Sequence, residues 1–184
     1  SAASDVYKRQ LQHKFAAICM HPDEVACKEL WMKAFGDDEQ FADSFIMRYY
    51  SRRRMLTAEA EGRMAAMLHL LPFRTELGRT TYIYGVATDP AFRGRGLASQ
   101  LMREAMRLIA ERGDDAALLI PTPGKEWLRE FYGRFGFAGD VPARFVSADR
   151  FDFGTGDAAA DRAMVWRRDS SVPLPEQLTA SWHS

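Results

Sequence analysis

The sequence predicts an α/β domain of the α+β kind, in which helices flank a mixed, mostly antiparallel sheet. Helical and extended hydrophobic periods alternate along 184 residues, a length that suits one domain. Three consecutive extended segments have short connections, as in an antiparallel meander. A later helix separates two extended segments, which predicts that those two strands run parallel. The expected order is β-αα-βββ-α-β-α-β.

The first part of the chain is expected to supply one strand and two helices. The apolar run Lys14–Met20 predicts a short buried strand. Pro22 suits the first position of a helix that ends at Gly36. A second helix follows, and Asp37 with Gln40 three residues later resembles a capping box. The apolar stripes are Cys27, Leu30, Trp31, Ala34 and Phe35 in the first helix, and Phe41, Phe45 and Tyr49 in the second.

The rest of the chain alternates between strands and helices. The next helix ends at Gly113, and a short buried strand, Ala116–Ile120, follows it. A further helix is expected to run to Gly136. The remainder, Phe137–Trp166, is predicted to be rich in loops, with Arg162–Arg168 as its best strand. The three strands of the meander are Met55–Glu61, Arg63–Phe73 and Thr80–Thr88.

Three regions are expected along the chain. Residues 1–10 are set aside as a disordered or artefactual terminus, because Asp5–Gln10 matches a translated sequencing adapter. Residues 11–168 form the domain itself. Residues 169–184, with Pro173 and Pro175, are expected to be a loosely held C-terminal tail.

Composition excludes several classes of protein. The formal net charge is zero, so no basic field attracts nucleic acid or an anionic membrane. No apolar run approaches the ~20 residues of a membrane span. The two cysteines form no metal, redox or disulfide pattern, which favours a reducing, cytoplasmic location. The four histidines have no ligand spacing with Asp, Glu or Cys, so no metal is expected.

A turn rich in glycine and arginine lies where the third meander strand meets the next helix, in DPAFRGRGLASQLM. The start of a helix exposes N–H donors and the positive end of the helix dipole, which together bind anions. Gly94 and Gly96 let the backbone approach a phosphate closely, and Arg93 and Arg95 add charge. The alternative is a tight structural turn with arginines that face solvent. The chain contains neither a P-loop nor the G-x-G-x-x-G of a dinucleotide-binding unit.

Three motifs resemble one family, the Gcn5-related N-acetyltransferases (GNAT). RGRGLA, Arg93–Ala98, resembles the R/Q-x-x-G-x-G/A signature of that family. YGVATDP, Tyr84–Pro90, resembles its fourth strand, and REFYGRFGF, Arg129–Phe137, resembles a later motif in which a helix ends in tyrosine. FYGRFGF, Phe131–Phe137, is also similar to the catalytic half of the enhanced-intracellular-survival acetyltransferases. The resemblance covers about Phe15 to Trp166.

The resemblance implies an N-acetyltransferase in which an amine attacks acetyl-CoA, the co-substrate, directly in a ternary complex. It implies that Tyr132 is the general acid, which protonates the departing thiolate. Gly85 predicts a bulge that opens a slot beside its strand. The pantetheine arm would pair with the backbone of Val86, Ala87 and Thr88. The turn that would bind the pyrophosphate comprises Arg93, Gly94, Arg95, Gly96, Leu97, Ala98 and Ser99.

The general base is left open. Several family members place a glutamate where this chain has Tyr82. Glu59, Glu61, His69 or a residue of the Ala138–Asp161 loop could act through water. An amine of low pKa, or a chain of water molecules, would serve equally.

The acceptor is expected to enter between the first two helices and the late loop, as a small-molecule amine or a protein amine. Acidic side chains there would favour a polyamine, an aminoglycoside or a lysine, although a well-capped helix start explains them equally. They are Asp37, Asp38, Glu39 and Asp43. Two other hypotheses are a non-catalytic acyl-CoA-binding or regulatory module and an interaction protein whose turn is only structural. Whether the chain is a monomer or a homodimer is open.

Overall fold

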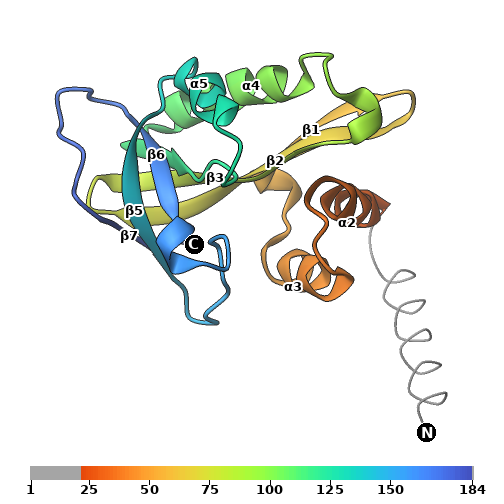
Figure 1. The fold of residues 1–184 in the computed structure, drawn as a ribbon, viewed down its shortest axis with the longest axis horizontal. Helices are drawn as coiled ribbons and strands as arrows, with labels where there is room; N and C mark the ends of the chain where they lie inside the picture. Colours follow the sequence, from red (N-terminus) through yellow and green to blue (C-terminus); the bar gives the residue numbers. More distant parts are fainter. Residues whose placement is uncertain (1–21, 184) are drawn as a thin grey trace, which may run out of the picture.

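The computed structural model describes residues 22–183, in which a seven-stranded sheet has helices on both faces (Figure 1). The spatial order of the strands is β1-β2-β3-β4-β6-β5-β7, with an additional pairing of β2 with β7. The strands are β1 (Met55–Ala60), β2 (Arg63–Thr75), β3 (Gly78–Thr88), β4 (Ala116–Leu119), β5 (Ala138–Val146), β6 (Arg162–Arg167) and β7 (Leu178–Trp182). The mixed α/β fold agrees with the prediction. The predicted strand Lys14–Met20 and the set-aside residues 1–10 lie outside the described residues.

Helices α2 (Pro22–Phe35) and α3 (Glu39–Tyr49) cover one face of the sheet (Figure 1). The side chain that caps α3 is Asp38, which accepts a hydrogen bond from the Phe41 amide at 2.7 Å. The capping box predicted for Asp37 is therefore wrong by one residue. Asp37 does not cap α3. Its side chain instead accepts a hydrogen bond from the Trp31 indole of α2.

Helices α4 (Leu97–Arg112) and α5 (Trp127–Gly133) lie on the opposite face. α4 ends before Gly113, as predicted, and Gly113 has the left-handed conformation. Helix α5 ends at Gly133, earlier than the expected end at Gly136. Arg134–Gly136 instead form a turn with hydrogen bonds between residues three apart. Short 3₁₀ turns lie at Arg52–Arg54, Pro90–Phe92 and Ala158–Ala160.

Strand β4 pairs with β3 in parallel, as the intervening helix predicts, and the meander β1-β2-β3 is antiparallel. Two strands were not predicted. β5 lies in the segment expected to be rich in loops, and it pairs with both β6 and β7. It contains Gly139 and Pro142, two residues that disfavour the prediction of a strand.

Strand β7 corrects the expectation of a loosely held tail. It pairs in parallel with β5 and also contacts β2, and Leu178 and Ala180 are buried. Pro173 and Pro175 precede the strand and do not interrupt it, so its ladder keeps every N–H donor. The segment 178–182 is an integral part of the sheet.

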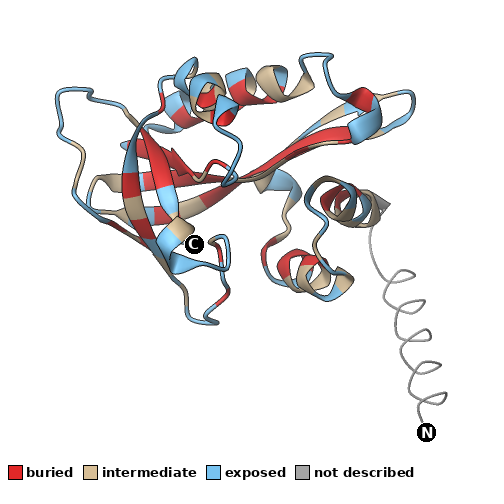
Figure 2. Cartoon of the chain, in the orientation of Figure 1, coloured by how far each residue is buried: buried red, intermediate tan, exposed pale blue. Residues whose placement is uncertain are grey.

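Buried side chains gather along the sheet and the inward faces of the helices (Figure 2). One cluster lies between the sheet, α2, α3 and the C-terminal strands, and the other lies under α4 and α5. Each fully buried large apolar side chain stabilises the fold by roughly 1.5–3 kcal/mol relative to its exposure. These side chains include Phe45, Phe73, Phe92, Phe153 and Met102. Among the described helices, none has the length and apolar character needed to cross a membrane.

Candidate active site

A bulge at Gly85 interrupts the ladder between β2 and β3. Met67 pairs with Ala87 and His69 pairs with Tyr84, so β3 contains one more residue than β2 between these pairs. Gly85 has φ of +64°, and a Cβ there would lie 2.6 Å from the Trp31 ring. Only glycine suits this position, because both the left-handed conformation and the close contact exclude a side chain. The predicted bulge is confirmed.

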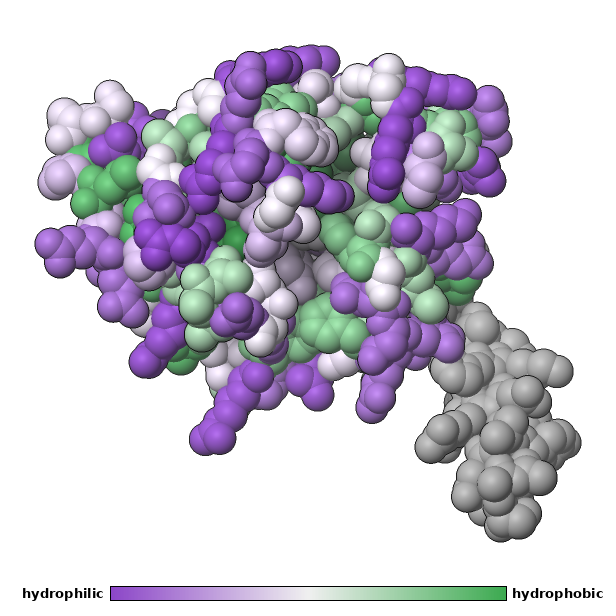
Figure 3. Space-filling view, in the orientation of Figure 1, coloured by the Kyte–Doolittle hydropathy of each residue, from purple (hydrophilic) through white to green (hydrophobic). Residues whose placement is uncertain are grey.

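Strands β3 and β4 separate just before the bulge. Their parallel pairing ends with Tyr82 opposite Leu118. A pocket of about 510 Å³ opens beside the separated strands, with Tyr82–Val86 on one side and Leu119, Ile120, Thr122 and Pro123 on the other. The predicted slot beside the bulged strand is therefore present. Figure 3 shows a hollow in the middle of this face, with hydrophobic residues gathered beside it over α2 and α3.

The glycine–arginine turn forms an open backbone loop at the start of α4. Gly94 has φ of +78°, and Gly96, the N-cap residue, has φ of +74°. No atom lies within 4 Å of a Cβ built at either glycine, so the space above the turn is open. Within the described residues, the amides from Gly94 to Ser99 have no hydrogen-bond acceptor, and the ladder of α4 begins with the Gln100 amide. This arrangement is an anion-binding geometry.

Arg95 is held close to the turn. Its guanidinium lies 4.9 Å from the centre of the Phe92 ring and 3.8 Å from a Glu61 carboxylate oxygen. Glu61, a candidate base in the sequence, therefore lies beside the glycine–arginine turn, and it does not line the pocket.

Asp89 anchors the turn, although the sequence did not single it out. Its amide donates to the Ala65 carbonyl at 2.8 Å, and its side chain accepts from the Ala91 amide at 2.9 Å. The hydrogen bond from Ala91 and the charge of Lys33 lower the pKa of this buried carboxylate. An Asp-Pro pair directly after a strand is the signal that could have identified this role.

Tyr132 reaches the pocket from α5. Its side chain is 7% exposed and lines the pocket. The hydroxyl forms no hydrogen bond with the described residues, yet it is not among the oxygen atoms sealed from solvent, so it faces the pocket. Burial raises the pKa of Tyr132 to about 12, which keeps the phenol protonated at neutral pH.

The wall opposite Tyr132 is aromatic and acidic. Trp31 and Phe35 come from α2, Phe41 from α3, and Asp37 from the turn between these helices. Asp152 comes from the loop that joins β5 to β6. The sequence indicated this loop only as a range, since nothing local distinguishes Asp152 from the other acidic residues near it.

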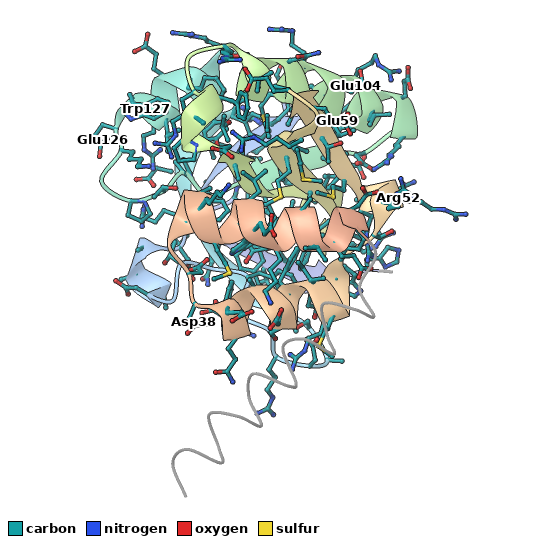
Figure 4. All side chains as sticks on the ribbon, turned by 90° about the vertical axis from the view of Figure 1, so that its right-hand side faces the viewer. Asp38, Arg52, Glu59, Glu104, Glu126 and Trp127 are labelled. Atoms are coloured by element: carbon teal, nitrogen blue, oxygen red, sulfur yellow. The ribbon has the colours of Figure 1, made fainter. Side chains whose placement is uncertain are left out.

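Three of the four acidic residues expected at the acceptor entrance have other roles. Asp38 caps α3 and lies at the start of that helix in Figure 4. Glu39 and Asp43 form ion pairs with Lys28 at 2.6 and 2.7 Å. Only Asp37 lines the pocket.

Two further base candidates, Glu59 and His69, do not line the pocket. Glu59 is exposed on β1, as Figure 4 shows. His69 is fully buried, and burial lowers its pKa to about 3. Tyr82, which lines the pocket, donates its hydroxyl hydrogen to the Phe153 carbonyl at 2.8 Å, so it joins β3 to the late loop.

Comparison with solved structures places this fold among known acetyltransferases. A GNAT family N-acetyltransferase from Escherichia coli, solved in complex with CoA, is 17% identical with a TM-score of 0.61, over 89% of this chain and 86% of that chain. A GNAT family acetyltransferase from Brucella melitensis, in complex with acetyl-CoA, is 17% identical with a TM-score of 0.58, over 90% and 93% of the two chains. The ribosomal-protein-S18-alanine N-acetyltransferase from Escherichia coli is 15% identical with a TM-score of 0.53, over 84% and 96%.

No curated protein sequence matches this chain. A family model described as an acetyltransferase (GNAT) domain matches residues 21–139, a range that includes the meander, the glycine–arginine turn, Tyr132 and the helices on both faces. Its description names the GNAT domain alone, so the narrower resemblance to the enhanced-intracellular-survival group stays a prediction. The chain belongs to the GNAT family of acetyltransferases.

Proposed function

We propose that the protein transfers the acetyl group of acetyl-CoA to a primary amine by direct attack within a ternary complex. One observation carries this proposal: the pocket between the separated strands has the Tyr132 hydroxyl on its wall, and β3, which lines it, leads to the open amides that begin α4. The two solved relatives bound to CoA and acetyl-CoA support acetyl-CoA as the co-substrate.

In this proposal the pyrophosphate of acetyl-CoA binds the turn Gly94–Ser99, with Arg93 and Arg95 supplying positive charge. The free amides and the helix dipole favour an anion there. The pantetheine arm runs along Val86, Ala87 and Thr88 and pairs with the edge of β3. That edge is available because the pairing of β3 with β4 ends at Tyr82.

The acceptor arrives as an ammonium ion and first loses one proton to water in the open pocket. The neutral nitrogen then attacks the thioester carbonyl carbon, and the C–N bond forms as the C–S bond breaks. The Tyr132 hydroxyl donates its proton to the leaving sulfur, and solvent returns a proton to Tyr132. The nitrogen loses its surplus proton to water in the open pocket. The phenol retains its proton until it is needed because burial raises its pKa to about 12. The same enclosed site would raise the pKa of the leaving thiol.

The test is a Tyr132→Phe variant in an assay of free thiol release from acetyl-CoA with a panel of amines. Loss of a general acid typically costs a factor of ~10²–10⁴ in rate, so we expect kcat to fall by at least ~100-fold. The variant should keep its affinity for CoA, measured as the rise in melting temperature with millimolar CoA. Turnover equal to that of the wild type would remove Tyr132 from the mechanism.

The wild type also tests the alternatives. Stabilisation by CoA without turnover of any amine would favour a non-catalytic acyl-CoA-binding module. No stabilisation by CoA would favour a purely structural turn. The cytoplasmic location and the absence of nucleic-acid and membrane partners remain predictions from the sequence, and the choice between monomer and homodimer stays open.

A further inference from the structure

We infer that the acceptor is an arylalkylamine, a small primary amine with one positive charge on a flat apolar body. The inference rests on the proposed acetyl transfer and names the acceptor class for the same pocket. It is carried by an aromatic wall, two carboxylates and an unpartnered tyrosine hydroxyl that meet on the side of the pocket opposite Tyr132.

The aromatic wall is built around Trp31. The ring centre of Trp31 lies 5.0 Å from that of Phe35, 5.4 Å from Tyr84 and 6.3 Å from Phe41. All four rings line the pocket. A flat apolar group in the pocket can therefore pack against these rings, and an aromatic pair is worth about 0.5–1.5 kcal/mol beyond the area it buries.

The wall is rigid before any acceptor binds. The Trp31 indole N–H donates to Asp37 Oδ2 at 2.8 Å, and the ring stacks on Phe45 with centres 4.8 Å apart. Gly85 also packs against the indole, where a Cβ would lie 2.6 Å away. Trp31 is only 2% exposed, so it is the fixed base of the wall, against which the more exposed Phe35, Phe41 and Tyr84 pack. Little conformational entropy is therefore lost when a ligand binds against this wall.

The charge of the pocket selects a cation. Asp37 and Asp152 line it, and none of the described residues that line it is a lysine, arginine or histidine. The Trp31 indole occupies one oxygen of Asp37, and the Gly154 amide occupies Oδ1 of Asp152 at 2.9 Å. Each carboxylate therefore has a second oxygen that can accept a hydrogen bond from an ammonium group.

The Tyr84 hydroxyl lies within the electrostatic reach of both carboxylates. Burial, and then the negative charges of Asp37 and Asp152, raise the pKa of this phenol. Tyr84 lines the pocket, and within the described residues its hydroxyl has no hydrogen-bond partner and is not among the polar atoms sealed from solvent. A positively charged amine in this position would face two carboxylates, a hydroxyl oxygen and ring faces, which all attract a cation.

Asp152 is held in position by its own loop. Phe151 and Phe153, on either side of it, are 8% and 1% exposed. Asp149 in the same loop accepts a hydrogen bond from the Tyr49 hydroxyl of α3 at 2.6 Å. The loop is therefore fixed to the helices that carry the aromatic wall, and the carboxylate and the rings keep a constant relative position.

The same features disfavour polycations and sugars. A polyamine such as spermidine carries three or more ammonium groups at neutral pH, but only two carboxylates, Asp37 and Asp152, line the pocket. Glu39 and Asp43 do not line it and form ion pairs with Lys28. An aminoglycoside would place many hydroxyl groups against the four rings, where they would lose water without gaining partners. Neither class uses the aromatic wall fully.

The test compares kcat/KM for five amines in the thiol-release assay: 2-phenylethylamine, tryptamine, spermidine, kanamycin and a lysine-containing peptide. We expect the two arylalkylamines to exceed the others by at least ~10-fold. Butylamine, which keeps the charge and lacks the ring, should be at least ~10-fold poorer than 2-phenylethylamine. A higher kcat/KM for spermidine, kanamycin or the peptide would overturn the inference and leave the acetyl transfer intact.

Binding is measured separately, so that the two proposals can fail independently. With CoA present, 2-phenylethylamine should lower the tryptophan fluorescence of the protein and raise its melting temperature, and 3-phenylpropionate should do neither. Binding of 2-phenylethylamine without turnover of any amine would support the acceptor class and reject the proposed function. Equal binding of the amine and the carboxylate would overturn the acceptor class.

Two variants locate the recognition. Asp152→Asn keeps the acceptor for the Gly154 amide and removes the charge, so KM for 2-phenylethylamine should rise about tenfold while KM for acetyl-CoA stays constant. Phe35→Ala should raise KM for 2-phenylethylamine and leave KM for butylamine unchanged. Glu176→Gln and Met47→Ala are the matched controls, since both residues are exposed and neither lines the pocket. Unchanged KM values in both test variants would overturn the inference.

Discussion

His69 is a fully buried histidine on β2, packed against Trp31 and Phe45. Burial, with a smaller contribution from the positive charge of Arg54, lowers its pKa to about 3. In the unfolded chain the pKa of histidine is about 6.5, so the unfolded state binds the proton first as the pH falls. The contribution of His69 to stability is therefore complete above pH ~6.5 and is lost progressively between pH ~6.5 and pH ~3.

The prediction is a pH-dependent difference between two variants. Between pH 7.5 and pH 5.5 the wild type should lose about 1.4 kcal/mol more unfolding free energy than His69→Gln, measured by urea denaturation. His183→Gln is the matched control, because His183 is exposed and should leave the pH dependence of the wild type unchanged. Equal pH slopes for the wild type and His69→Gln would contradict the prediction.

Single residues of the site were predictable only where they belong to a motif. Tyr132 and the turn Arg93–Ser99 lie in short patterns whose spacing the backbone geometry requires. Asp152 and Trp31 have no such pattern, because they meet only when the β5–β6 loop folds against α2 and α3. Their proximity depends on distant buried anchors, Phe151 and Phe153, which no local sequence pattern identifies.

At the scale of the element, the bulged strand β3 makes a sharp prediction at Gly85. Gly85→Ala should destabilise the fold by about 1–3 kcal/mol through backbone strain, and by more through the contact with Trp31. It should also raise KM for acetyl-CoA, because the strand edge beside the slot would shift. Unfolding experiments and thiol-release kinetics measure the two effects.

Gly113→Ala is the matched control for this substitution. Gly113 also has a left-handed backbone, with φ of +75°, but no atom lies within 4 Å of a Cβ built there. We expect this variant to show the strain alone, with an unchanged KM for acetyl-CoA. If the two variants lost equal stability, the contact between Gly85 and Trp31 would have no energetic role.

The elements that the sequence predicted well have a strong period or a punctuating residue. Helices α2, α4 and α5 end at or near glycines, and β2, the central strand of the meander, is long and apolar. β5 was missed because Gly139 and Pro142 are residues that a strand usually lacks. Pro142 is tolerated there because the amide that donates on the β6 side is that of Ala143, and the pairing of β5 with β7 begins only at Ala143.

At the scale of the whole molecule, β7 determines how firmly the C-terminal region is held. Leu178 is 1% exposed between β5 and the rest of the first core cluster. Leu178→Ala should cost about 2–5 kcal/mol of unfolding free energy, the usual range for such a truncation in a packed core. Val172→Ala, at a residue that is 40% exposed in the preceding loop, should change stability by less than about 0.5 kcal/mol. Equal effects would mean that β7 contributes little.

The fold class was predictable because it depends on the order of the helices and strands. That order follows from the hydrophobic period and the turn residues within each segment. The complete sheet was not, because its last strand is short and its partners are distant in sequence. Five residues of alternating burial, Leu178–Trp182, carry too weak a pattern to be distinguished from a tail. The hydrogen bonds that define it come from β5 and β2.

The pairing of β7 with both β5 and β2 means that the strands from β2 onward return to their starting point. Phe73 and Trp182, which meet at this junction, are separated by about a hundred residues of chain. During synthesis on a ribosome, the edge of β2 that pairs with β7 therefore stays unpaired until the last strand has been made. A chaperone could bind the nascent chain at this edge during that interval.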